Sequence, residues 1–111
     1  MTDQSAVTPE LIKEIVFRDL KITAADGTEY TTEFVEVEDQ SGGCGQAFKV
    51  CIVSPGFARI TLLQRHRLVN EVLKDIIPRI HAFSQKTFTP EQWEVFKVAR
   101  EEAIRMAALQ Q

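Results

Sequence analysis

Two side chains of this 111-residue sequence could act as metal ligands or nucleophiles from exposed positions. Cys44 lies in the stretch Ser41 to Gly45, in which three of five residues are glycine. We expect this stretch to be an exposed loop, because a buried loop would leave backbone polar groups without partners. A thiol there is a metal ligand, a nucleophile, a redox sensor or simply a turn residue. His81 opens a short alternating segment, and it is either a ligand or an ordinary surface histidine.

A third candidate is the cationic run Arg65-His66-Arg67 near the start of an expected helix. Cations at a helix N-terminus are disfavoured by the helix dipole, so their presence suggests a use. A carboxylate, a phosphate or an acidic loop of a partner would fit, whereas the alternative is a solvated first turn. Residues 55–90 carry six Lys or Arg against two acidic residues, although the whole chain has a net charge of −3. This basic middle is either a face for an acidic partner or a chance cluster.

Several catalytic patterns are absent from the sequence. It contains no Gly-x-Gly-x-x-Gly, no Walker loop, no His-Glu-x-x-His and no Cys-x-x-Cys. A nucleophilic pair of Cys44 and His81 lacks an evident Asn or Asp to orient it, and a glycine-rich loop fixes a nucleophile poorly. We therefore expect no enzyme. The second cysteine, Cys51, lies within an expected strand, where we interpret it as structural.

Composition indicates one globular domain outside the secretory pathway. Apolar residues make up 44% and charged residues 26% of the chain, which is ordinary for a folded domain. The first residues match neither a secretory signal nor a transit peptide, and no apolar run is long enough for a membrane span. We expect a cytoplasmic or nuclear protein with reduced thiols. The net negative charge argues against nucleic acid as the main partner.

Hydrophobic spacing predicts an α+β domain with two layers. Helices are expected over residues 9–22, with Thr8 as the cap, and over 62–76, where Pro78 stops the helix. Strands are expected over 34–38 and 48–53, paired as an antiparallel hairpin, and over 81–88. A capping box of Thr89 and Gln92 begins the last helix, which runs toward Met106. The economical packing places the helices on one face of a small mixed sheet.

Five segments of the sequence resemble the BolA family, most closely its cytosolic branch. The resemblance covers about residues 8–96 in order. The segments that carry it are Val35-Glu36-Val37-Glu38-Asp39 followed by Ser41-Gly42-Gly43-Cys44-Gly45, then Phe48-Lys49-Val50, Arg65-His66-Arg67-Leu68-Val69-Asn70, Ile80-His81-Ala82-Phe83 and Thr89-Pro90-Glu91-Gln92-Trp93.

This resemblance implies a fold like a type II KH domain, with helices on a three-stranded mixed sheet. It also implies a heterodimer with a monothiol glutaredoxin and a shared [2Fe-2S] cluster. The family's ligand positions correspond to His81 and Cys44, and the glutaredoxin and its bound glutathione would supply the other ligands. Arg65, His66 and Arg67 would then contact glutathione or the partner. An iron-responsive regulator or an apo acceptor protein would lie downstream, whereas a nucleic-acid-binding KH-like regulator is the alternative.

The sequence departs from the family pattern in three places. Arg59 stands where the family often has a lysine. Residues 24–32 form a longer first connection than is usual. The tail from Val98 to Gln111 extends beyond the family's usual end. We divide the chain into a flexible N-terminus (1–7), a BolA-like domain (8–97) and a helical extension (98–111).

Overall fold

The computed structural model describes residues 7–42 and 47–110. Its three-stranded sheet has two α-helices on one face and the last helix on the other. The strands β3, β4 and β5 form a mixed sheet in that order, with β3–β4 antiparallel and β4–β5 parallel. A separate two-stranded sheet pairs β1 with β2. The elements in chain order are α1 (Pro9–Asp19), β1 (Lys21–Thr23), β2 (Glu29–Thr31), β3 (Phe34–Asp39), β4 (Ala47–Val53), the 3-10 helix η1 (Pro55–Arg59), α2 (Leu62–Val72), the 3-10 helix η2 (Ile77–Arg79), β5 (Ala82–Phe88) and α3 (Pro90–Leu109).

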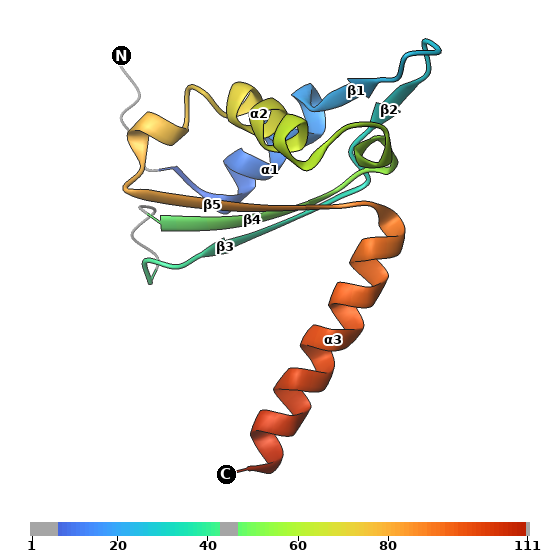
Figure 1. The fold of residues 1–111 in the computed structure, drawn as a ribbon. Coiled ribbons are helices and arrows are strands. Elements are labelled where there is room, and N and C mark those ends of the chain that lie inside the picture. Colours follow the sequence, from blue (N-terminus) through green and yellow to red (C-terminus); the bar gives the residue numbers. More distant parts are fainter. Residues whose placement is uncertain (1–6, 43–46, 111) are drawn as a thin grey trace.

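The predicted α+β fold with a three-stranded mixed sheet is confirmed, and so is the antiparallel hairpin of β3 and β4. The prediction that the helices pack on one face of the sheet is wrong for α3: α1 and α2 cover one face, whereas α3 leaves the end of β5 on the opposite side (Figure 1). The reason is that β4 is apolar on both faces. Phe48 and Ile52 are buried in the core under α1 and α2, while Cys51 and Val53 are buried against Trp93 of α3.

The first predicted helix, over residues 9–22, is too long at its C-terminal end. Helix α1 ends at Asp19, and Leu20 takes an extended backbone conformation as its cap. Ile22 then lies in β1, buried and paired with Tyr30 across the hairpin. Ile22 would also fit the apolar stripe of a helix, so spacing alone could not separate the two structures. The longer connection noted over residues 24–32 is therefore the turn and second strand of a hairpin.

The second predicted helix, over residues 62–76, is also too long. Helix α2 ends at Val72, and the chain continues through tight turns into η2. Leu73 and Ile76 remain buried beyond the helix end, which is why their spacing looked helical. Pro78 excludes a longer helix, because its ring would clash with the carbonyl four residues earlier and it has no N–H to donate.

One glycine is required by close packing between η1 and the β1–β2 hairpin. A Cβ atom on Gly56 would lie 2.8 Å from the Cβ atoms of both Ile22 and Tyr30. Real Cβ contacts are longer than this, so any other residue would push η1 away from the hairpin. Gly56 thereby sets how closely the start of α2 approaches the β1–β2 sheet.

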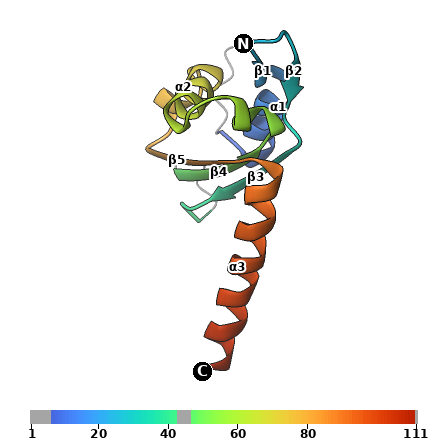
Figure 2. The ribbon, with the colours of Figure 1, turned by 45° about the vertical axis from the view of Figure 1, so that its right-hand side comes forward.

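Helix α3 has a packed half and a projecting half. Trp93 is buried, whereas all residues from 101 to 110 are exposed. A second view shows the helix pointing away from the sheet (Figure 2). The helix is continuous across the boundary that we place between 97 and 98. Among the described helices, none has both the length and the apolar character needed to cross a membrane.

Candidate functional site

His81 lies exposed at the entrance to β5. The preceding residue, Ile80, packs against the main core, and the following residue, Ala82, is the first residue of the strand. Ala82 is paired with Ala47, the first residue of β4. The backbone on both sides of His81 is therefore fixed by core packing and by the sheet. Its imidazole is open to solvent and available as a nitrogen donor.

Cys44, the other predicted ligand, lies outside the described residues. Its pairing with His81 therefore stays a prediction. In the sequence it precedes Ala47 by three residues, and Ala47 is the register partner of Ala82. Within residues 7–42 and 47–110, no three His, Cys, Asp or Glu side chains gather to hold a metal ion. A metal centre at His81 would thus need further ligands from residue 44 or from another molecule.

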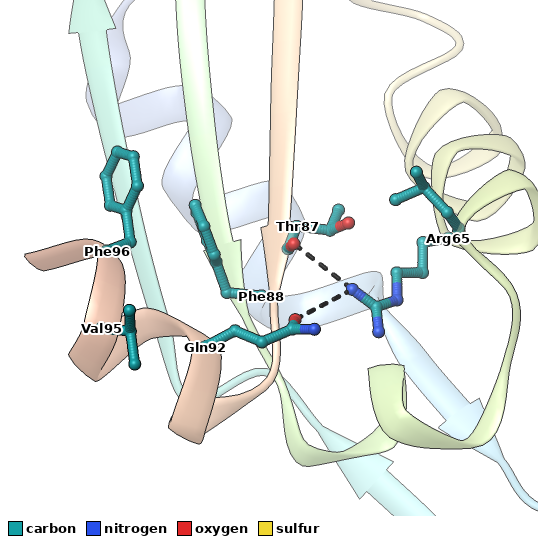
Figure 3. A pocket seen from close by; sticks show the side chains of 7 residues that line it. Arg65, Thr87, Phe88, Gln92, Val95 and Phe96 are labelled. Carbon is teal, nitrogen blue, oxygen red and sulfur yellow. Dashed lines mark hydrogen bonds between the residues drawn. The ribbon is translucent and has the colours of Figure 1, made fainter.

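Arg65 joins three separate elements at the other end of β5. Its Nε donates to the carbonyl oxygen of Phe57 at 3.0 Å. One terminal nitrogen donates to the carbonyl oxygen of Thr87 at 3.4 Å and to Oε1 of Gln92 at 3.2 Å, as Figure 3 shows. Its guanidinium also lies over the Phe57 ring, 5.4 Å from the centroid. Partial burial lowers the pKa of Arg65, but the group stays protonated at neutral pH.

The structure separates the predicted cationic run from His81. His66 is half-buried and lines a hollow beside Lys86, whereas Arg67 is exposed. Arg65 contacts Thr87, six residues along β5 from His81, which corresponds to roughly 20 Å at the rise of a strand. Arg65 and His66 therefore do not share one compact site with His81. Whether Arg65, His66 or Arg67 contacts a partner stays a prediction.

The face of the sheet that α3 covers carries an ion pair above a buried thiol. Arg100 of α3 donates to both carboxylate oxygens of Glu36 on β3, at 2.6 and 3.4 Å. Cys51 lies beneath them, 3% exposed, and burial followed by the charge of Glu36 raises the pKa of its thiol. Buried thiols of raised pKa are unreactive, so the arrangement agrees with a structural role.

A hollow between α2 and α3 is a surface feature that the sequence pattern did not reveal. It has a volume of about 540 Å³ and is open at the end of β5 (Figure 3). Leu62 and Val95, which form part of its wall, are 60% and 71% exposed. Val95 lies beside the stripe of Trp93 and Phe96 that faces the sheet. An apolar residue outside the stripe that packs in the core was the sequence signal that could have indicated this hollow. The lining residues are Leu62, Arg65, Thr87, Phe88, Gln92, Val95 and Phe96.

Comparison with known proteins agrees with this fold. A family model described as BolA-like protein matches residues 28–92. The chain is 44% identical over 88 residues to human BolA-like protein 2, which covers 78% of this chain and 91% of that protein. It is 37% identical over 73 residues to a Vibrio cholerae protein named DNA-binding transcriptional regulator BolA, covering 60% and 69%. A solved structure of a bol-like protein from Babesia bovis matches with a TM-score of 0.62 at 36% identity, over 86% of this chain and 99% of that one. The chain belongs to the BolA family.

Proposed function

We propose that this protein is a non-enzymatic iron–sulfur partner of a monothiol glutaredoxin. The two proteins form a heterodimer that shares a [2Fe-2S] cluster. His81 and Cys44 are the ligands from this chain, and a cysteine of the glutaredoxin and its bound glutathione complete the set. The cluster then serves iron sensing through a regulator, or it is delivered to an apo acceptor protein in the cytoplasm or nucleus.

The observation that carries this proposal is the position of His81. An exposed imidazole on a backbone fixed by core packing is presented to another molecule without rearrangement. The chain also enters β4 at Ala47, beside Ala82, after the segment that contains Cys44. Imidazole and thiolate are established donors for iron–sulfur clusters. Membership of the BolA family supports the same assignment.

The direct test is reconstitution with a purified monothiol glutaredoxin, glutathione, ferrous iron and sulfide. We expect the chain alone to remain colourless, and the mixture to give the visible absorbance and circular dichroism of a [2Fe-2S] cluster. His81→Ala should prevent formation of the stable mixed cluster. Ser84→Ala, the matched control at an exposed residue of the same strand, should leave it intact. An intense cluster spectrum from the chain without glutaredoxin would contradict the proposal.

A nucleic-acid-binding role is the second candidate, and it is favoured by the name of the Vibrio cholerae relative. Against it stands the net charge of −3, which predicts weak and salt-sensitive binding, in the range of roughly 10⁻⁴ to 10⁻⁶ M for non-specific contacts. Gel-shift titration at physiological salt separates the two functions. Sequence-specific binding in the nanomolar range would replace the iron–sulfur proposal with this one.

A further inference from the structure

The hollow between α2 and α3 continues into a second one along β5. The second hollow, of about 290 Å³, shares four lining residues with the first. We call the two together the α2–α3 groove. The four shared residues are Leu62, Thr87, Phe88 and Phe96, and the second hollow adds His66, Gln85 and Lys86.

The floor of the α2–α3 groove is the outer edge of the sheet. Strand β5 is terminal in the order β3-β4-β5, and no strand among the described residues pairs with its outer side. The carbonyl oxygen of Phe88 faces β4, because it accepts from the backbone N–H of Ser54 at 3.0 Å. Backbone groups alternate between the two sides of a strand, so those of Thr87 and Gln85 face outward. The bond from Arg65 to the Thr87 carbonyl agrees with this direction.

Two buried oxygen atoms in this floor lack hydrogen-bond partners. They are Oγ1 of Thr87 and Oε1 of Gln85, in the part of the chain that the structure describes. Thr87 is 7% exposed and lines both hollows. Buried polar atoms are normally paired, so these two atoms leave acceptor capacity unused beside the strand edge.

The charge of the groove is opposite to that of the chain. Among the residues that the structure describes, no Asp or Glu lines either hollow, although the chain has 16 acidic residues against 13 Lys and Arg. The ionisable residues in the lining are Arg65, His66 and Lys86. The walls that face solvent, Leu62 and Val95, are aliphatic. This combination is complementary to a segment that carries carboxylates and a large apolar side chain.

We propose that the α2–α3 groove binds an extended acidic segment of a partner protein. The segment adds as a further strand to the outer edge of β5, and an apolar side chain enters the space beside Leu62 and Val95. Strand addition supplies affinity through main-chain hydrogen bonds and specificity through alternate side chains. The apolar walls favour a polypeptide over nucleic acid, whose phosphates are bound by rows of basic and polar groups.

This inference goes beyond the proposed iron–sulfur function. His81 precedes β5, whereas the groove begins at Gln85, four residues along and roughly 13 Å away by strand rise, and continues to Phe88 at the far end. One molecule can therefore hold a glutaredoxin at His81 and an acidic segment of another protein in the groove. The groove is then a recruiting surface, separate from the cluster ligands.

The test uses a fluorescent peptide of alternating glutamate and valine with one central phenylalanine, followed by anisotropy. We expect saturable binding, and shifts of the Gln85 and Thr87 amide signals in NMR spectra. Leu62→Glu and Val95→Glu should each weaken binding by at least about tenfold. Leu63→Glu and Val98→Glu are matched controls, because these residues are 57% and 62% exposed on the same helices but line neither hollow. The controls should change binding by less than about twofold.

Competition experiments identify the class of molecule that occupies the groove. Two variants then test whether peptide binding is independent of the cluster. A peptide with lysine in place of glutamate, one with methylated backbone nitrogens, and a thymidine oligonucleotide should not compete. The proposal would be overturned if the acidic peptide did not bind, if the lysine peptide bound equally well, or if the oligonucleotide competed. It would also be overturned if Leu62→Glu and Leu63→Glu weakened binding equally. His81→Ala should bind the peptide normally, and Leu62→Glu should still form the mixed cluster. Loss of the cluster in Leu62→Glu would contradict a separate surface.

Discussion

Ala47 and Ala82 lie directly opposite each other as the first residue pair of the parallel strands β4 and β5. The chain therefore enters both strands at the same end of the sheet. His81 immediately precedes one of these residues, and Cys44 precedes the other by three positions in the sequence. The proposed ligands thus both precede the paired starts of parallel strands, whereas Arg65 lies at the other end, from which the α2–α3 groove extends back as far as Gln85.

Arg65 should contribute to stability through its contacts with Phe57, Thr87 and Gln92. Arg65→Lys keeps the charge but removes the planar set of donors that reaches all three acceptors. We expect the free energy of unfolding to fall by about 1–2 kcal/mol, since two of these three hydrogen bonds from a charged group are half-buried. Urea denaturation followed by the fluorescence of the single tryptophan, Trp93, measures this.

Arg67→Lys is the matched control for that measurement. Arg67 is exposed on the same helix, so the free energy of unfolding should change by less than about 0.5 kcal/mol. An equal loss in both variants would mean that the contacts of Arg65 do not stabilise the fold.

The projecting half of α3 should be dispensable for folding. Ending the chain after Glu101 removes only residues that are exposed where described, so the free energy of unfolding should change by less than about 0.5 kcal/mol. Ending it after Phe96 also removes Arg100, which is paired with Glu36 and lies 5.3 Å from the Trp93 ring centroid. That chain should unfold at lower urea. If both truncations destabilise equally, the projecting residues have a structural role.

Local signals in the sequence predicted much of the fold. The cap at Thr8 and the capping box of Thr89 and Gln92 are present, and the alternation in β3 and β4 gave strands close to their observed ends. These features depend on neighbouring residues. The ends of α1 and α2 were misjudged because Ile22 and Leu73 are buried in non-helical backbone. Residues beyond the helix ends still pack in the core, so the apolar spacing continues past the points where the helices end.

The candidate site was only partly predictable for the same reason. The exposure of His81 follows from its place at a strand entrance, which the local pattern indicates. The role of Arg65 depends on Phe57, Thr87 and Gln92, which come from three different elements. The separation of Arg65 from His81 depends on how α2 lies along β5, and no local pattern encodes that arrangement.

The buried thiol of Cys51 predicts a loss of stability at alkaline pH. Burial, and then the charge of Glu36, raises the pKa of Cys51 in the folded protein, so the folded state holds this proton more tightly than the unfolded state. The associated stability is fully present below the pKa of an unfolded thiol, about 8.5, and is lost as pH rises through the higher folded value. In a Cys44→Ser background, urea denaturation at rising pH should show this loss.

Cys51→Ala in the same Cys44→Ser background isolates the contribution of the thiol from other alkaline titrations. The difference in pH dependence between the two proteins is the quantity to compare. Cys51 should also resist thiol reagents in the folded protein and react on unfolding, because it is 3% exposed. Rapid labelling of Cys51 under native conditions would contradict its structural role.

His81 should matter more than Cys44 for holding the cluster. The backbone of His81 is fixed by β5 and by the packing of Ile80, so binding through it orders little additional chain. Cys44 is flanked by glycines, and fixing backbone in one conformation costs about 1–2 kcal/mol per residue, which offsets part of the bond formed. His81→Ala should therefore abolish the stable mixed cluster, whereas Cys44→Ala should leave a more labile one.

Visible circular dichroism of each variant in complex with glutaredoxin, followed over time, measures cluster retention. Ser84→Ala should retain the cluster as long as the unmodified chain, which controls for a substitution elsewhere on β5. Acidification should release the cluster, because both ligands must be deprotonated to bind metal. A labile thiolate beside a fixed imidazole also suits transfer, since an acceptor can displace one ligand while the other still holds the cluster. Faster loss from Cys44→Ala than from His81→Ala would refute the argument that His81 is the fixed anchor.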